Sequence, residues 1–244
     1  MKKIMIGNFK GGVGKTVSAV SLAHALTLLK KKILLIDADP QGNSSNWLEP
    51  ENIEFELADI ISGKAEVKKA IVKTKQNFDL IPTFPDGDLR NVAEAELNKK
   101  PYIFDDIFSE LKNDYDYAIV DTSPSFSPLE RAVCLAVDEV ICPVELEFFA
   151  VDGLGQFDKN VQELNKNWRR NVKLEKILLT KENKSYSRHK LLFDEITKSK
   201  GYKFFVVRQD ALIAESIGLN CTIFERDKNA KSATDYMSIA KGLN

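Results

Sequence analysis

A short glycine-rich stretch, Lys10-Gly11-Gly12-Val13-Gly14-Lys15-Thr16, constrains the fold of this chain more than any other feature. An apolar run typical of a strand precedes it near Lys3–Gly7, and a long helical pattern over Lys15–Leu29 begins inside it. Glycines let successive backbone N–H groups turn toward an anion, and the start of a helix adds the positive end of its dipole. The stretch therefore predicts a phosphate-binding loop, or P-loop, between a strand and a helix.

Within this loop, each residue type has a predicted role. Lys15 is expected to reach the β- and γ-phosphates of a nucleotide, and the Thr16 hydroxyl to bind Mg²⁺. The general P-loop pattern has a further glycine at the position of Phe9, so the match to that pattern is incomplete. The predicted nucleotide-binding set in the loop is Gly11, Gly12, Val13, Gly14, Lys15, Thr16 and Val17.

Carboxylates follow two further apolar runs. Asp37 and Asp39 end the run that begins at Ile33, and Asp121 ends the run that begins at Tyr117. Residues two apart on a strand share a side, and ligands of open α/β sheets lie beyond the carboxyl ends of the strands. We therefore expect all three carboxylates beside the P-loop, where they would support a magnesium ion directly or through water.

Short apolar runs alternate with helical patterns along the whole chain, which is typical of an α/β fold with a mainly parallel, twisted sheet and helices on both faces. We expect about seven or eight strands, in one domain spanning residues 1–244. Strands are predicted near Lys3–Gly7, Ile33–Asp37, Phe78–Ile81, Tyr117–Asp121, Glu139–Pro143, Lys176–Leu179 and Lys203–Val207, with a weaker one at Thr222–Phe224. Helices are predicted near Lys15–Leu29, Leu89–Leu97, Ile103–Lys112, Leu129–Ala136, Gly153–Trp168, Lys190–Lys198 and Ala230–Lys241. The polar stretches Asn43–Ala65 and Thr180–His189 are predicted to be loops or lids.

Composition excludes several classes of protein. A formal net charge of −1 and a pI of about 6.2 argue against a dedicated nucleic-acid domain, so any DNA contact must come from a local patch. Cys134, Cys142 and Cys221 form no C-x-x-C pair, which argues against a disulfide framework or zinc site and suits a reducing cytoplasm. No run approaches ~18 apolar residues, so no membrane span is expected. His24 and His189 have no neighbours in the sequence that suggest a metal site.

Several motifs in order resemble the ParA/Soj/MinD group of ATPases, whose P-loop also begins with a lysine. The matching segments are Lys10–Thr16, Ile36–Asn43, Val120–Ser125, Pro143–Glu145, Asp152–Leu154, Phe224–Asp227 and Ala233–Tyr236. They span nearly the whole chain, and they are most similar to the short ParA/Soj type without an added helix-turn-helix domain. The resemblance implies a P-loop NTPase fold that uses ATP, ADP and Mg²⁺. It does not include the cysteines that an iron–sulfur reductase of the same superfamily needs between its subunits.

The resemblance also implies a cycle. ATP closes a homodimer in which Lys10 of one subunit contacts the phosphates held by the other, beside the catalytic Lys15, and Asp39 orients the attacking water. The metal set is Thr16, Asp37, Asp39 and Asp121, and Thr180, Arg208 and Asp210 are candidates for the nucleotide's adenine pocket. The dimer binds double-stranded DNA without sequence preference, and a ParB-like partner stimulates its slow hydrolysis to partition plasmids or chromosomes. A cytoplasmic, nucleoid-associated protein is expected.

Departures from the group bear mostly on DNA binding. Val17 replaces a threonine, while Gln209 and Leu212 are not basic where relatives often carry arginine. The candidate DNA contacts are Lys181, Lys184, Arg188, Lys203 and Arg208, with acidic residues interleaved. Two alternatives stay open: a nucleotide-dependent scaffold that positions a protein cargo, and a MinD-like ATPase on a membrane surface. The latter needs a terminal amphipathic helix, which this sequence does not show.

Overall fold

A single eight-stranded sheet runs through the molecule, which is described here by a computed structural model covering residues 1–147, 150–183, 187–199 and 201–243. In spatial order its strands are β3 (Val72–Lys73), β4 (Asp79–Ile81), β2 (Ile33–Ala38), β5 (Tyr117–Thr122), β1 (Lys2–Ile6), β6 (Glu139–Glu145), β7 (Lys173–Glu182) and β8 (Lys203–Arg208). All neighbouring pairs are parallel except β3 and β4. The predicted α/β class, with a mainly parallel sheet, is confirmed.

The central strands β2 and β5 are apolar up to the carboxylates near their carboxyl ends, because helices cover both of their faces. Every residue of β2 and β5 is buried, and the two strands pair so that Asp37 lies opposite Asp121. Parallel strands end at the same edge of a sheet, and this register therefore brings the two carboxylates together there.

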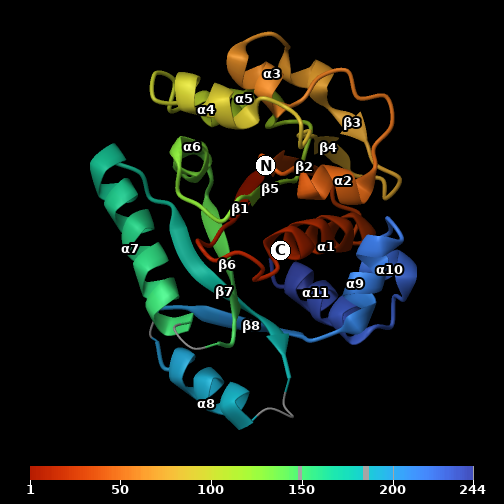
Figure 1. Ribbon diagram of the computed structural model, residues 1–244, viewed down its shortest axis with the longest axis vertical. Coiled ribbons are helices and arrows are strands. Elements are labelled where there is room, and N and C mark those ends of the chain that lie inside the picture. The colour runs from red at the N-terminus through yellow and green to blue at the C-terminus, as the bar shows by residue number, and fades with distance from the viewer. Residues whose placement is uncertain (148–149, 184–186, 200, 244) are drawn as a thin grey trace.

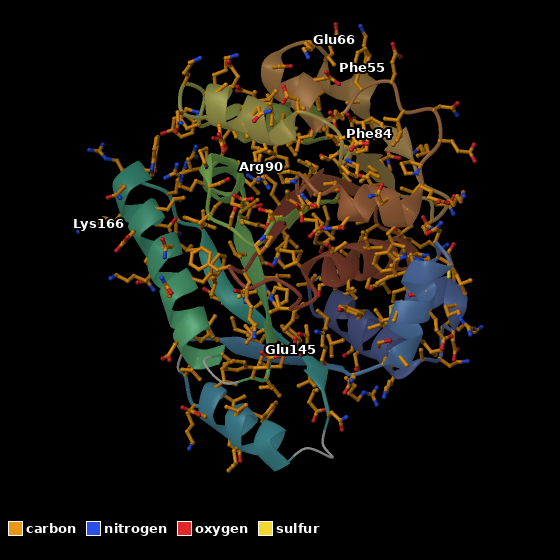
Figure 2. The ribbon with its side chains drawn as sticks, in the orientation of Figure 1. Phe55, Glu66, Phe84, Arg90, Glu145 and Lys166 are labelled. Carbon is orange, nitrogen blue, oxygen red and sulfur yellow. The ribbon has the colours of Figure 1, made fainter. Side chains whose placement is uncertain are left out.

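Helices form a layer on each side of the sheet (Figure 1). One layer contains α1 (Lys15–Leu28), α2 (Asn43–Leu48) and α11 (Lys231–Lys241), whose buried side chains pack on β1, β2 and β5. The other contains α3 (Leu57–Ser62), the 3₁₀ helix η1 (Val67–Ala70), α4 (Leu89–Glu96), α5 (Ile103–Leu111), α6 (Pro128–Ala136), α7 (Ala150–Trp168) and α8 (Ser187–Ile196). Near α11 lie α9 (Ala211–Gly218) and α10 (Ile223–Arg226). Lys166 of α7 and Glu66 lie at the outer rim (Figure 2).

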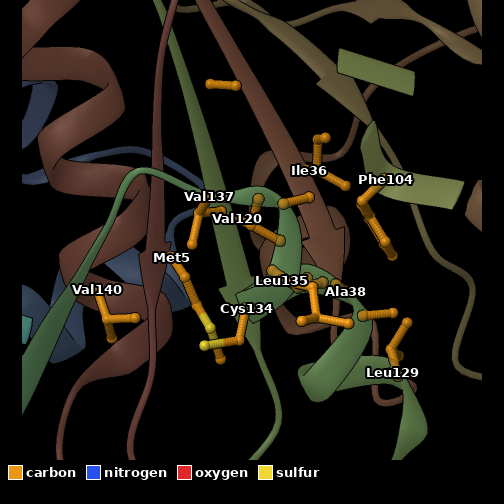
Figure 3. Packing of buried hydrophobic residues seen from close by; sticks show 14 of the residues in the cluster. Met5, Ile36, Ala38, Phe104, Val120, Leu129, Cys134, Leu135, Val137 and Val140 are labelled. Atoms are coloured by element: carbon orange, nitrogen blue, oxygen red, sulfur yellow. The ribbon is translucent and has the colours of Figure 1, made fainter. Parts of the chain in front are cut away.

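The core between the sheet and α6 illustrates how alternate strand residues face one layer. Met5 of β1 and Val120 of β5 point to the same side, where Cys134 of α6 meets them (Figure 3). All three are fully buried, so Cys134 acts as a small apolar side chain. Burial raises the pKa of its thiol to about 12, which keeps the thiol protonated.

Three sequence expectations are corrected by the structure. The weak strand predicted at Thr222–Phe224 is wrong: Thr222 caps α10, accepting a hydrogen bond from the Glu225 amide. Residues 43–65 are not simply a loop, since they contain α2 and α3. Residues 180–183 are partly strand, because β7 extends to Glu182. Thr222 and Glu225 form a capping box, and that local pairing outweighs the β-propensity of a short apolar run.

Candidate functional site

The P-loop connects β1 to α1 through a backbone that requires glycine. Gly12 and Gly14 have φ angles of +74° and +89°, a left-handed conformation that other residues adopt at a cost. Gly14 is the N-cap of α1, and no described side chain caps this end of the helix. The first-turn N–H groups of α1 therefore keep their capacity to bind an anion, which the helix dipole favours.

Lys15 already lies inside this loop. Its ammonium group donates a hydrogen bond to the carbonyl oxygen of Lys10 at 2.8 Å, and only 7% of the residue is exposed. Burial lowers the pKa of Lys15, while the carboxylates of Asp121 and Asp39 oppose that shift. A buried cation held next to uncapped amides makes the loop an electropositive cradle for phosphate.

Asp37 and Asp121 form a buried carboxylate pair beside the loop. Asp37 accepts hydrogen bonds from the amide and hydroxyl of Ser45, at 2.8 and 2.7 Å. Asp121 accepts a hydrogen bond from Ser44 at 2.7 Å and another from Thr16. Burial raises the pKa of both carboxyls; the charge of Asp121 raises the pKa of Asp37 further, and the charge of Asp39 raises that of Asp121. Such a pair favours a compensating cation.

The donor set fits a magnesium ion that is shared with a nucleotide. Oδ1 of Asp121 is buried and, within the described residues, has no hydrogen-bond partner. The same part of the chain holds no group of three or more His, Cys, Asp or Glu residues that could bind a metal by themselves. Magnesium commonly takes one or two carboxylates and completes its shell with water and phosphate oxygens. Thr16, Asp37 and Asp121 are therefore suited to an ion that arrives with its nucleotide.

Asp39 lies two residues beyond Asp37 and is also buried. It accepts hydrogen bonds from the Gln41 amide at 2.9 Å and from the Asn43 side chain at 3.4 Å. Its side chain lines a cavity of about 500 Å³. This acceptor lines a cavity, and its charge acts on Lys15 of the P-loop, so it is in a position to orient a water molecule.

Lys10, the first residue of the loop, is oriented differently from Lys15. It is exposed, and its ammonium forms an ion pair with Glu147, which follows β6. The Lys10 amide donates a hydrogen bond to Oδ1 of Asn8 at 3.1 Å. The Asn8 side chain in turn donates from Nδ2 to the carbonyl oxygen of Pro143 at 2.7 Å. The side chain of Lys10 is thus on the surface, where a second molecule could meet it.

The proposed adenine-pocket residues lie in two places. Thr180 is buried beneath the loop, where its hydroxyl donates to the Val13 carbonyl oxygen at 2.9 Å. Asp210 caps α9 and accepts hydrogen bonds from the amide and hydroxyl of Ser232. Arg208 donates hydrogen bonds from Nε and Nη2 to the carboxylate of Asp235. Its Nη2 also donates to the Lys231 carbonyl oxygen at 3.0 Å. Thr180 therefore supports the loop, whereas Arg208 and Asp210 join β8 and α9 to α11.

Three of the five candidate DNA contacts lie among the described residues, and each of the three has a partner. Lys181 pairs with Glu145 at 2.8 Å, and the ammonium of Lys203 lies 4.9 Å from the centre of the Phe205 ring. Arg208 pairs with Asp235 as described above. Lys184 and the side chain of Arg188 lie outside the described residues. The DNA contacts stay a prediction.

Sequence reasoning missed the serines that support the carboxylates. Ser44 and Ser45 lie on α2, in a stretch that we expected to be a loop. Gly42, with a φ of +60°, starts that helix, and Trp47 and Leu48 are buried on one side of it. The signal was a polar N-terminal turn followed by two large apolar residues.

Comparison with known proteins identifies the family. A family model described as an AAA domain matches residues 1–175. The sporulation initiation inhibitor protein Soj of Bacillus subtilis is 32% identical, and the alignment covers 98% of this chain and 97% of Soj. The chain belongs to the ParA/Soj family of partition ATPases. The chromosome partitioning protein ParA of Caulobacter vibrioides is also 32% identical, over 89% of this chain and 82% of that ParA.

Solved structures of ParA/Soj relatives agree with this assignment. A Borrelia burgdorferi protein described as a plasmid partition protein, solved with AMPPNP bound, matches with a TM-score of 0.85. It is 26% identical, and the match covers 99% of this chain and 98% of the other. The described residues contain a single eight-stranded sheet, which carries the P-loop after β1. None of the helices in this described part is long and apolar enough to cross a membrane.

Proposed function

We propose that this ParA/Soj-type ATPase binds ATP with Mg²⁺ between the P-loop and the Asp37–Asp121 pair and hydrolyses it slowly to ADP. One juxtaposition carries the proposal: the start of α1, which no described side chain caps, and the buried Lys15 lie beside a buried carboxylate oxygen of Asp121. Among the described residues this oxygen has no hydrogen-bond partner. The amides and Lys15 suit the phosphates, and the carboxylate suits the metal. Gly11, Gly12, Val13, Gly14 and Val17 complete the binding loop.

The side chains around the loop divide the tasks of hydrolysis, and Asp39 serves two of them. Lys15 binds the β- and γ-phosphates, and Asp39 orients the attacking water from the cavity that it lines. Thr16, Asp37, Asp39 and Asp121 would hold the magnesium ion directly or through water. Bound magnesium would supply positive charge that stabilises the phosphate oxygens.

We further propose that ATP drives formation of a homodimer. Lys10 is the residue that crosses to the phosphates of the other subunit. Its exposed ammonium forms a surface ion pair with Glu147, and such pairs contribute about 0–1 kcal/mol, so exchange of that partner costs little. A second cation that arrives only with a second chain links turnover to assembly.

The cellular role that follows is partition of plasmids or chromosomes in the cytoplasm, on the nucleoid. The ATP-bound dimer binds double-stranded DNA without sequence preference, and a ParB-like partner stimulates hydrolysis and release. Lys181, Lys184, Arg188, Lys203 and Arg208 are the proposed DNA contacts. Phosphate contacts from lysine and arginine give affinity that falls steeply with salt.

One observation favours a second candidate, a nucleotide-dependent scaffold for a protein cargo. Lys181 and Arg208 both have carboxylate partners, so their charge is not freely available to DNA. In that case ATP still drives dimerisation, but the surface that the dimer forms binds a protein cargo instead of DNA. The two candidates differ in whether ATP-dependent binding to an arbitrary duplex occurs.

The test uses Asp39→Ala, with Asp138→Ala as a matched control. Asp138 directly precedes β6 and pairs with Lys3 of β1. We expect the wild-type protein to bind ATP with Mg²⁺, to dimerise and to release phosphate. Asp39→Ala should keep ATP-dependent dimerisation but lose turnover by about 10²-fold or more, the usual contribution of acid–base positioning. Wild-type turnover in Asp39→Ala would refute the role of Asp39, and absence of ATP binding in the wild type would refute the proposed function.

A further inference from the structure

A buried glutamate holds the loop that follows β5, the strand that carries Asp121. Glu130, on α6, is 1% exposed. Its Oε1 accepts a hydrogen bond from the Ser123 hydroxyl at 2.5 Å, and its Oε2 accepts one from the Ser125 hydroxyl at 2.7 Å. Oε2 also accepts from the amide and hydroxyl of Ser127, at 2.9 and 2.5 Å. One carboxylate therefore holds three serines of the loop at residues 123–127.

Helix capping explains only part of this arrangement. Ser127 and Glu130 form a capping box at the start of α6, and the chain has similar boxes at α3 and α10. A capping box satisfies amides of the helix itself. Ser123 and Ser125 lie before the cap, so their hydrogen bonds to Glu130 add nothing to the helix and serve the loop instead.

The loop lies against the P-loop. Pro124 is a neighbour of Gly11, since a Cβ on the glycine would lie 4.0 Å from the proline Cγ, an ordinary van der Waals contact. Phe126 packs edge to face on Phe9, with ring centres 5.8 Å apart, and both rings contact Phe157 of α7. Phe9, which departs from the general P-loop pattern, thus anchors the loop at residues 123–127.

The loop also forms one wall of the cavity that Asp39 lines. Ser123, Pro124 and Ser125 border this space of about 500 Å³, together with Arg90 of α4. Figure 2 shows Arg90 in the region between α4 and α6. Asp39 and the Glu130-bound serines therefore line the same cavity, and Ser123 follows Asp121 of β5 by two positions.

We propose that Glu130 is a positioning residue for ATP hydrolysis, because it fixes the Ser123 and Ser125 wall of the cavity in which Asp39 orients water. The inference rests on the proposed function. In that reaction a water oxygen bonds to the γ-phosphorus, the bond to the β–γ bridging oxygen breaks, and ADP, phosphate and a proton leave. A shift of the wall by a fraction of an ångström disturbs the water while the phosphate cradle is unchanged.

Replacing Glu130 itself would remove the cap of α6 as well, so the test removes the serine hydroxyls instead. The double variant Ser123→Ala/Ser125→Ala keeps the box formed by Ser127 and Glu130. We expect its affinity for a fluorescent ATP analogue with Mg²⁺ to stay within about twofold. Its single-turnover rate of phosphate release should fall on the order of 10-fold or more, since misplacement near the reacting atoms costs up to ~10²-fold.

Two further variants separate positioning from stability. Asp59→Ala removes the equivalent box carboxylate at α3 and should lower Tm by about 2–4 °C without changing the rate. Ser123→Thr/Ser125→Thr restores both hydroxyls and should recover most of the rate. An unchanged rate in the alanine variant, or loss of rate and affinity in equal proportion, would overturn the role of Glu130. If the wild-type protein itself released no phosphate, the proposed function would fail rather than this inference.

Discussion

The Lys15 ammonium nitrogen lies 2.8 Å from the Lys10 carbonyl oxygen, so the P-loop lysine closes the loop back on its own first residue. This hydrogen bond keeps a partly desolvated cation in place before any anion arrives. The Lys10 side chain points instead to Glu147 on the surface. The two lysines of one loop are therefore oriented for different tasks, and separate substitutions of Lys15 and Lys10 should have different effects.

We expect Lys15→Ala to weaken nucleotide binding by about 10–100-fold, since hydrogen bonds to charged groups contribute about 1.5–3 kcal/mol. Fluorescence anisotropy of a labelled ADP with Mg²⁺ measures this loss. Lys166→Ala, an exposed lysine on α7, serves as the control and should bind normally. Equal affinities in all three proteins would show that Lys15 does not bind phosphate.

Lys10→Ala should leave nucleotide affinity within about threefold but abolish ATP-dependent dimerisation and turnover, because the missing cation acts only between subunits. Light scattering with a slowly hydrolysed ATP analogue reports the mass, and phosphate release reports the rate. The control is Lys73→Ala, another exposed lysine paired with a carboxylate, that of Asp79 on β4. A dimer of Lys10→Ala with full activity would remove Lys10 from the mechanism.

Arg208→Gln should reduce DNA affinity, and the dependence of log affinity on log salt should become shallower by about one phosphate contact. ATP binding should not change. Because Arg208 also joins β8 to α11 through Asp235, the companion variant is Asp235→Asn, which keeps the arginine charge but weakens that link. If both variants lose DNA affinity alike, Arg208 acts through the fold; if neither does, the DNA site lies elsewhere.

His24 provides a pH test of the packing between α1 and α10. Its Nδ1 lies 2.6 Å from the Thr222 hydroxyl, and burial lowers its pKa from the usual value near 6.5. Below that value the unfolded chain binds a proton that the folded chain resists, so stability falls as pH decreases toward the lowered pKa. The slope from this one group is at most about 1.4 kcal/mol per pH unit.

Chemical unfolding of the wild type and of His24→Asn between pH 7.5 and 5 tests this expectation. The asparagine keeps a polar atom near Thr222 but does not titrate. The wild type should lose stability faster than the variant as pH falls below about 6.5. Parallel curves would mean that His24 is protonated without cost in the folded protein.

The sequence alone determined the sheet and the P-loop because both depend on local patterns. Apolar runs predicted seven of the eight strands, and the glycines at 12 and 14 predicted a loop that needs left-handed backbone. Asp37 and Asp121 could be placed together because parallel strands end at one edge. Short elements such as β3, α2 and α9 were not predicted from the sequence, because so few residues show too little periodicity.

Only the tertiary structure decided which polar groups satisfy one another. Lys10 meets Glu147 across 137 positions of sequence, and Ser44 meets Asp121 across 77. Arg208, which its charge suggested as a DNA contact, forms hydrogen bonds with Asp235. Phe9 packs against Phe126 in the loop after β5. Periodicity reports which face of an element is buried, whereas the pairing of charges and rings depends on how elements far apart in the chain are brought together.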